Sequence, residues 1–162
     1  MLHSGFVAIV GRPNVGKSTL MNALVGEKVA IVSSRPQTTR NRIMGVYTEQ
    51  DAQLVFLDTP GLHTPRTRLG EYMMQAAREA LQGIDALVTM VDATAAGKQD
   101  DAVARDMARY QVKKALVLNK IDLLRKDALL SLMERYADAG YDDIMPVSAA
   151  TGDGVEALKR LL

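Results

Sequence analysis

The feature that most constrains the fold is an apolar run that leads directly into a glycine-rich segment near the start of the chain. Residues 6–10 read FVAIV, and residues 11–19 read GRPNVGKST. The apolar run predicts a buried strand, and the residues after the second glycine predict the start of a helix. A strand that enters a helix in this way is typical of anion-binding loops, because glycine permits tight turns and close approach of the backbone to a ligand.

Each part of this segment has a chemical role in holding phosphate. From Gly11 to Ser18 the sequence follows the pattern G-x-x-x-x-G-K-S. Backbone amides between Asn14 and Thr19 can converge on phosphate oxygens at the positive end of the helix. Lys17 can bridge β- and γ-phosphate oxygens, and the Ser18 hydroxyl can bind Mg²⁺. The alternative is a chance glycine-rich turn with a solvated lysine. The expected phosphate-binding residues of this nucleotide site are Gly11, Asn14, Val15, Gly16, Lys17, Ser18 and Thr19.

Short apolar runs alternate with segments of helical periodicity along the rest of the chain. Runs such as ALVLN are apolar throughout, which is typical of strands covered on both faces, so we predict an α/β fold with a mostly parallel, doubly wound sheet. A short polar connection, EQDA, joins the second and third strands and predicts a hairpin, with one antiparallel strand at the sheet edge. The six expected strands are residues 6–10, 42–48, 53–58, 86–92, 114–119 and 144–148. The expected helices are residues 17–25, 69–82, 99–109, 127–138 and 154–162.

The segment LNKID at the end of one expected strand indicates guanine as the base. The carboxylate of Asp122 can accept hydrogen bonds from N1–H and the 2-amino group of guanine, which adenine does not offer. Asn119 can contact the purine or tie this segment to the phosphate loop, and Lys120 can lay its aliphatic stem along the base plane. The alternative is a solvated turn.

A second segment, SAATG, follows the next expected strand. Its backbone amides, notably that of Ala149, can meet guanine O6, although this composition is common in loops. The expected guanine-binding residues are Asn119, Lys120, Asp122, Ser148, Ala149 and Ala150.

Two further segments suit metal binding and sensing of the γ-phosphate. In LDTPG, Asp58 at a strand end can hold Mg²⁺ directly or through water, and Gly61 leaves its N–H open to the γ-phosphate. The alternative is an ordinary Asp-Thr-Pro-Gly turn. In the polar segment SSRPQTTRNR, either Thr38 or Thr39 can offer a hydroxyl to Mg²⁺.

Composition narrows the class of protein. The chain has 162 residues, 48% of them hydrophobic and 24% charged, which is typical of one globular domain. A formal net charge of +1 gives no global attraction to nucleic acid or to an anionic membrane, and the absence of cysteine excludes disulfides and thiolate metal sites. No apolar run approaches the roughly 20 residues that span a bilayer, and we expect no signal peptide. The lack of cysteine fits a reducing cytosol, and we expect a cytoplasmic protein that is a monomer.

Five motifs in a fixed order carry a family resemblance: the phosphate loop, the threonine segment, D-T-P-G, N-K-x-D and S-A. This set resembles the translation-factor-like small GTPases. The stretches GFVAIVGRPNVGKSTL, RPQTTRNRIMGV, FLDTPGLH and PVSAATGDGV resemble the Era family of bacterial ribosome-assembly GTPases. The resemblance implies a P-loop NTPase G domain that binds GTP and GDP, with switches at residues 31–41 and 59–69 and the small ribosomal subunit and its rRNA as partners. It assigns catalysis to Lys17, Thr39 and Gly61, and Mg²⁺ to Ser18, Thr39 and Asp58.

Two further expectations come with this resemblance. Leu62 stands where many GTPases place a glutamine that orients water, as it does in Era-like enzymes, so we expect slow intrinsic hydrolysis. Related enzymes can use K⁺ bound partly by an asparagine, and the resemblance gives this possible role to Asn14. Era-type proteins continue into a C-terminal KH-type RNA-binding domain, and we expect residues 1–162 to form one GTP-binding domain without it.

The leading prediction is an enzyme that hydrolyses GTP to GDP and phosphate with Mg²⁺. The main alternative is a guanine-nucleotide-binding module with negligible hydrolysis in the absence of a further domain or a partner. An RNA-binding assembly factor and an ATP-using P-loop enzyme are the remaining alternatives, and Asp122 argues against the second of these.

Overall fold

The computed structural model of the chain describes five stretches, which are residues 3–11, 15–25, 42–49, 52–58 and 83–161. The helix that we expect over residues 69–82 lies outside these stretches. Within them, no helix combines the length and the apolar character that crossing a membrane requires.

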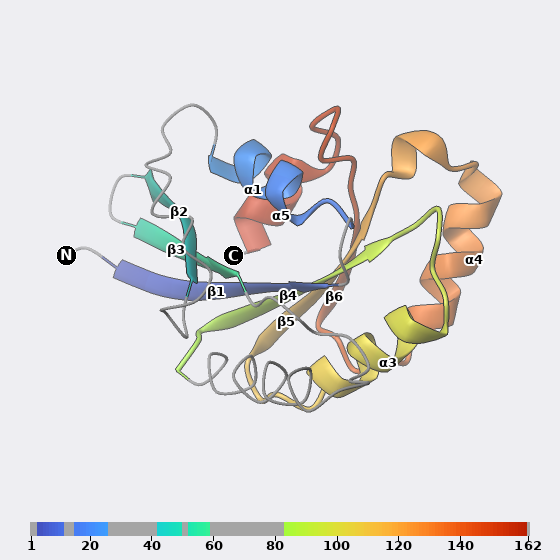
Figure 1. The fold of residues 1–162 in the computed structure, drawn as a ribbon, viewed down its shortest axis with the longest axis horizontal. Helices are drawn as coiled ribbons and strands as arrows, with labels where there is room; N and C mark the ends of the chain where they lie inside the picture. Colours follow the sequence, from blue (N-terminus) through green and yellow to red (C-terminus); the bar gives the residue numbers. More distant parts are fainter. Residues whose placement is uncertain (1–2, 12–14, 26–41, 50–51, 59–82, 162) are drawn as a thin grey trace.

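Six strands within the described stretches form one sheet in the order β2-β3-β1-β4-β5-β6 (Figure 1). They are β1 (His3–Gly11), β2 (Arg42–Glu49), β3 (Ala52–Asp58), β4 (Ala86–Asp92), β5 (Lys113–Asn119) and β6 (Asp143–Pro146). β1 pairs in parallel with β3 and β4, and β5 pairs in parallel with β4 and β6. β2 runs antiparallel to β3 at the edge of the sheet. The predicted mostly parallel sheet with one antiparallel edge strand is therefore confirmed.

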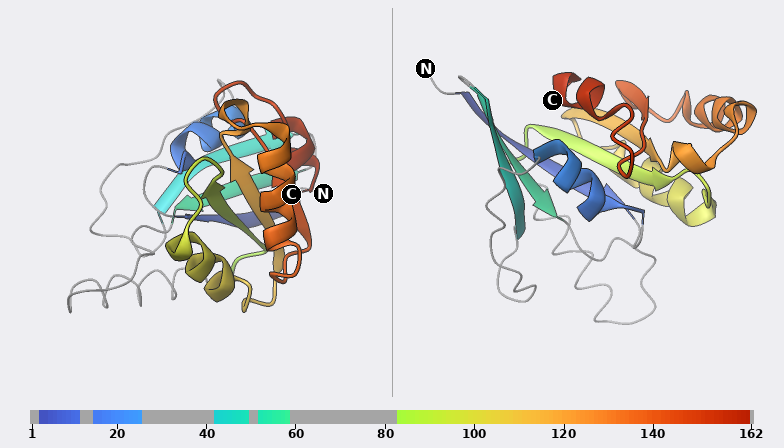
Figure 2. Two further views of the ribbon diagram at one scale, coloured as in Figure 1. Left: turned by 90° about the vertical axis from the view of Figure 1, so that its right-hand side faces the viewer. Right: turned by 90° about the horizontal axis from the view of Figure 1, so that it is seen from above.

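Helices cover both faces of the sheet (Figure 2). Four are described: α1 (Lys17–Val25), α3 (Lys98–Met107), α4 (Lys126–Tyr136) and α5 (Val155–Leu161). α1 and α5 pack against one face, and α3 and α4 pack against the other (Figure 1). The chain is therefore the three-layered α/β fold that the alternation of apolar runs and helical segments predicts.

The central strand β1 shows why its sequence is apolar at successive positions. Side chains of a strand point alternately to its two faces. Val7 and Ile9 enter the core under α1 and α5, whereas Ala8 and Val10 enter the core on the opposite face. All four are at most 1% exposed. Burial on both faces thus explains the absence of polar alternation in this run.

Polar contacts at its two ends hold α3 in place. At its start, the side chain of Asp100 accepts a hydrogen bond of 2.9 Å from the amide of Gly97, which satisfies a donor at the helix N-terminus. Beyond its end, Lys114 Nζ donates to the carbonyl oxygens of Ala108 and Tyr110, each at 2.8 Å. A lysine at this position satisfies carbonyls that have no partner within the helix.

A polar network joins α3 to α4 and to the sheet. Asp101 forms an ion pair with Arg135 and accepts a hydrogen bond of 2.7 Å from the Tyr136 hydroxyl. The Tyr141 hydroxyl donates to the carbonyl of Ala104 at 2.8 Å and lies 2.9 Å from a buried threonine hydroxyl of β4. Burial raises the pKa of Tyr141 to about 12.

The structure differs from the prediction after β5 and β6. A short 3-10 helix, η2 (Ile121–Leu123), follows β5 and was not expected. β6 ends at Pro146, although a strand to residue 148 was expected, because the chain beyond it turns back on itself. The amide of Ser148 donates to the carbonyl of Asp153 at 2.8 Å, which closes this turn instead of extending the sheet.

Substitution of two leucines that differ in burial tests whether helices cover the sheet on both faces. Leu118 in β5 is 0% exposed, whereas Leu130 on α4 is 59% exposed. We expect Leu118→Ala to lower the free energy of unfolding by about 2–5 kcal/mol, because it leaves a cavity in the core. Leu130→Ala, the matched control, is expected to change it by less than about 0.5 kcal/mol. Urea unfolding of both variants measures this, and equal losses would contradict the described packing.

Candidate nucleotide-binding site

The residues predicted to bind nucleotide follow neighbouring parallel strands. Parallel strands bring their carboxyl ends to one edge of a sheet, and ligands of open α/β sheets bind at this edge. The glycine-rich loop follows β1, Asn119 ends β5, and the S-A segment follows β6, while Asp92, which was not predicted, ends β4. Asp92 and Asn119 are also direct neighbours in the pairing of β4 with β5. The fold thus gathers segments from distant parts of the chain at one place.

Both glycines of the loop are required by close packing. A Cβ atom on Gly11 would lie 2.9 Å from the carbonyl oxygen of Met90 and 2.9 Å from Cγ2 of Val15. Gly16 has a φ of 102°, which side chains rarely adopt, and a Cβ there would overlap the Asn119 amide nitrogen. Its carbonyl accepts a hydrogen bond of 2.9 Å from Leu20 as α1 begins. Gly11 and Gly16 therefore lie against β4 and Asn119 with no room for larger residues at these two positions.

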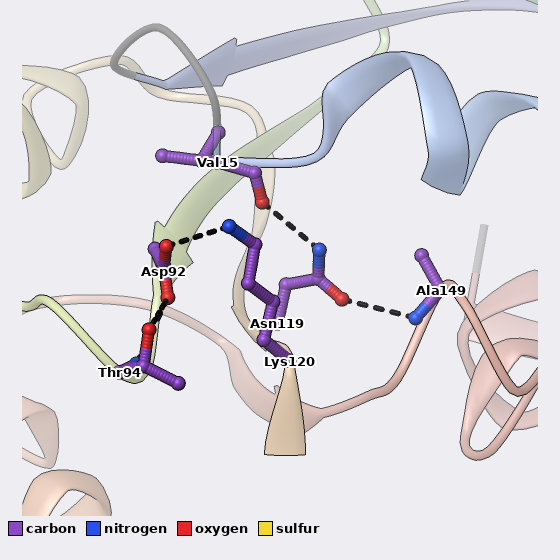
Figure 3. A network of polar contacts seen from close by, with 6 residues as sticks. All are labelled: Val15, Asp92, Thr94, Asn119, Lys120 and Ala149. Atoms are coloured by element: carbon purple, nitrogen blue, oxygen red, sulfur yellow. Dashed lines mark hydrogen bonds and ion pairs between the residues drawn. The ribbon is translucent and has the colours of Figure 1, made fainter. Parts of the chain in front are cut away.

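The side chain of Asn119 connects three of the predicted segments (Figure 3). Its Nδ2 donates to the carbonyl of Val15 at 2.9 Å, and its Oδ1 accepts from the amide of Ala149 at 3.0 Å. Asn119 is 3% exposed, so both bonds are shielded from water. An amide side chain supplies one donor and one acceptor side by side, which a carboxylate or a hydroxyl cannot do in this geometry. Of the two roles left open by the sequence, the structure shows the one that ties the loops together.

Ser148 lies behind the predicted base-reading carboxylate. Its Oγ donates to Oδ1 of Asp122 at 2.8 Å and accepts a hydrogen bond of 3.2 Å from the amide of Thr151. Ser148 is completely buried, whereas Asp122 is exposed. The serine therefore orients the carboxylate from the protein side. The predicted contact of the Ala149 amide with guanine O6 stays a prediction, because this amide donates to Asn119 in the structure.

Lys120 is held by a residue that the sequence analysis did not identify (Figure 3). Its Nζ lies 2.8 Å from Oδ2 of Asp92, and Oδ1 of Asp92 accepts hydrogen bonds from the amide and the hydroxyl of Thr94 at 2.9 and 2.6 Å. Burial alone would raise the pKa of Asp92, but the hydrogen bonds from Lys120 and Thr94 outweigh it and hold the pKa below its ordinary value. The sequence did contain a signal for this role of Asp92. It is an aspartate at the carboxyl end of an expected strand, with a threonine two residues later.

The predicted magnesium ligands are only partly covered by the described stretches. Asp58 ends β3, where its backbone pairs with Ile9 of β1, and Ser18 lies in the first turn of α1. Both positions are therefore at the phosphate-loop end of the sheet, and carboxylate and hydroxyl oxygens are ligands that Mg²⁺ prefers. Five positions of the prediction lie outside the described residues: Asn14, Thr38, Thr39, Gly61 and Leu62.

Replacing Gly16 with alanine tests the close approach of the loop to Asn119. Gly83 also has a positive φ, of 81°, but a Cβ there would meet nothing within 4 Å. We expect Gly83→Ala to lower the free energy of unfolding by about 1–2 kcal/mol through backbone strain alone. Gly16→Ala carries similar strain and in addition displaces the Asn119 side chain, so a clearly larger loss is expected in urea unfolding. Equal losses would show that the Asn119 contact is not maintained in solution.

Comparison with known proteins identifies the family. The family described as 50S ribosome-binding GTPase matches residues 6–120. GTPase Era of Ruminiclostridium cellulolyticum is 45% identical over 159 residues, which are 97% of this chain and 53% of that protein. GTPase Era of Lactobacillus delbrueckii subsp. bulgaricus is 49% identical over 160 residues, which are 98% of this chain and 53% of that protein. The chain thus spans about half the length of the curated relatives it matches.

Similarity in three dimensions agrees with the sequence comparison. A crystal structure of Era in complex with MgGDPNP and nucleotides 1506-1542 of 16S ribosomal RNA has a TM-score of 0.80 and 36% sequence identity. The match covers 99% of this chain and 56% of that chain. The resemblance to Era that the motifs predict is confirmed. Since the family match extends over more than half of the sequence, the chain belongs to the 50S ribosome-binding GTPase family.

Proposed function

We propose that this chain binds guanine nucleotides and hydrolyses GTP to GDP and phosphate with the help of Mg²⁺. The observation that carries the proposal is the buried bridge of Asn119 between Val15 and Ala149. It joins the loop suited to phosphates with the two segments suited to guanine. Val15 and Asn119, two of the residues that it connects, are 104 residues apart along the chain. A ligand with a base at one end and phosphates at the other fits such an arrangement.

Recognition of the base is proposed to depend on Asp122. Its carboxylate is exposed, and the hydrogen bond from Ser148 leaves acceptor capacity for N1–H and the 2-amino group of guanine. Adenine offers no such pair of donors and would leave the carboxylate unsatisfied. Lys120, whose side chain is 34% exposed, offers its aliphatic stem to the face of the base.

Hydrolysis is proposed to proceed by in-line attack of water on the γ-phosphate. Lys17 and the loop amides at the start of α1 would stabilise charge on the transferring group and on the leaving oxygen. Ser18, Thr39 and Asp58 are the proposed Mg²⁺ ligands, and the ion, when bound, neutralises charge on the phosphates. Asn14 is proposed as a ligand of K⁺, and Gly61 as a backbone donor to the γ-phosphate. No general base is assigned.

The biological role is proposed by analogy with the relatives. The solved Era structure contains a segment of 16S ribosomal RNA, and we propose that this chain acts on the small ribosomal subunit as part of its assembly. A cytoplasmic, monomeric protein fits this role. Loops that order around the γ-phosphate and Mg²⁺ and relax after hydrolysis would supply the switch.

A second candidate function follows from Leu62, which cannot polarise a water molecule. In this alternative the chain holds guanine nucleotide but scarcely cleaves it without further parts or a partner. Both candidates predict tight binding of GTP, so only cleavage distinguishes them.

Single-turnover cleavage separates the two candidates. We expect GTP, but not ATP, to be cleaved slowly with Mg²⁺, faster in potassium than in sodium buffer, and not at all after removal of Mg²⁺ with EDTA. Lys17→Ala is the control that abolishes nucleotide binding. Tight GTP binding without cleavage would favour the second candidate, and equal rates in the two buffers would contradict the role of Asn14 with K⁺.

The substitution Asp122→Asn tests whether Asp122 recognises guanine. The amide oxygen of asparagine can still accept from Ser148, but its NH₂ group repels the donors of guanine and suits the 2-oxo group of xanthine. We expect GDP affinity to fall about 10- to 100-fold and xanthosine diphosphate affinity to rise, measured by calorimetry. Asp127→Asn, on the exposed face of α4, is the matched control and should change neither. If the Asp122 variant kept its selectivity for guanine, the proposed role of Asp122 in binding the base would be wrong.

A further inference from the structure

The ammonium group of Lys120 is held by a neighbouring strand. Lys120 follows the last residue of β5, yet its Nζ lies 2.8 Å from Oδ2 of Asp92, the last residue of β4. The side chains of Lys120 and Asp92 are 34% and 16% exposed, so the pair is partly shielded from solvent. The backbone of Lys120 has a φ of 69°, the single positive value outside glycine among the described residues. This conformation is unfavourable for lysine, and the ion pair with Asp92 is one of the contacts that accompany it.

Asp92 is itself fixed on its other side. Its Oδ1 accepts from both the amide and the hydroxyl of Thr94, at 2.9 and 2.6 Å. Its backbone carbonyl accepts from Ala95 at 3.0 Å, and the amide of Ala93 donates to the carbonyl of Asn119 at 2.9 Å. Each carboxylate oxygen therefore has its own partner, and rotation of the carboxylate would break one contact to make another. Asp92 is a rigid anchor at the edge of the proposed site.

Because its ammonium group is bound to Asp92, the methylene chain of Lys120 lies between the side chains of Asp92 and Asn119 (Figure 3). A lysine side chain in solution samples many rotamers, and ordering it on ligand binding weakens affinity. Here Asp92 and Thr94 hold the side chain in one arrangement before any ligand arrives. The cost of ordering is therefore removed from the binding step.

We propose that Asp92, supported by Thr94, is a positioning residue that holds Lys120 as a preformed platform for the base and thereby sets how long a guanine nucleotide stays bound. This inference rests on the proposed function, because it needs a guanine nucleotide at the site. Asp92 acts through Lys120 and makes no contact with the nucleotide itself.

The dissociation rate of a fluorescent GDP analogue with Mg²⁺ tests the proposal. We expect Asp92→Ala to release GDP about tenfold faster than the unmodified chain, because the Lys120 side chain would then have to be ordered when the nucleotide binds. Thr94→Val, which keeps the ion pair but frees Oδ1 from one donor, should release it a few times faster. Asp92→Asn retains an oxygen for Lys120 and should fall between the alanine variant and the unmodified chain.

A double-mutant cycle shows whether Asp92 acts through Lys120. Lys120→Met keeps an apolar stem of similar length but removes the ammonium, and we expect it to raise the dissociation rate to a similar degree. Asp92→Ala should then add nothing in the Lys120→Met background. Additive effects, or an Asp92→Ala rate equal to that of the unmodified chain, would overturn the proposal.

Two controls separate this outcome from loss of fold and from failure of the proposed function. Asp101→Ala removes an ion pair between α3 and α4 of comparable exposure and should leave the GDP dissociation rate unchanged. Urea unfolding identifies any variant that is not folded, and if Asp92→Ala is one, Asp92→Asn and Thr94→Val carry the test. Failure of the unmodified chain to bind GDP would contradict the proposed function. Normal GDP binding with rates unaffected by these variants would contradict only the role of Asp92.

Discussion

The buried carboxamide of Asn119 holds together three segments that the sequence keeps far apart. It accepts from Ala149 after β6 and donates to Val15 in the glycine-rich loop, with almost no exposure to water. A buried amide that lost either partner would leave an unsatisfied polar group, so both bonds stabilise this arrangement. This side chain therefore helps to fix the position of Val15 relative to the proposed base site. The absence of a side chain on Gly16 is the complementary requirement, because it leaves room for the amide.

Two other residues of the proposed site are also held in place by less exposed side chains. Asp122 is exposed and oriented by the buried Ser148, and Lys120 is partly exposed and anchored by the less exposed Asp92. Asp122 and Lys120, both proposed to contact the base, are thus each held by a second side chain that is less exposed. Such support restricts rotamers before binding, which improves affinity without adding any contact to the ligand.

The parallel sheet makes this arrangement possible. β4, β5 and β6 end at one edge, and packing by helices on both faces keeps these ends at fixed separations. The polar network of Asp101, Arg135 and Tyr136 joins the two helices on one face. The layers therefore provide stability, while the segments after the strands carry the groups suited to a ligand.

Local patterns in the sequence determined the main elements of the fold. The strand–loop–helix at residues 6–19, the apolar runs of the sheet and the antiparallel hairpin are dictated by neighbours in the chain, because backbone preference and hydrophobic period act over a few residues. The segments N-K-x-D and S-A were recognised from the hydrogen-bonding groups that they place after two expected strands. The tertiary structure alone decided that Asn119 bridges the loops, that Ser148 lies behind Asp122, and that Asp92 anchors Lys120. These contacts join residues from 26 to 104 positions apart, and their partners are set by how strands and helices pack, which no short stretch of sequence specifies.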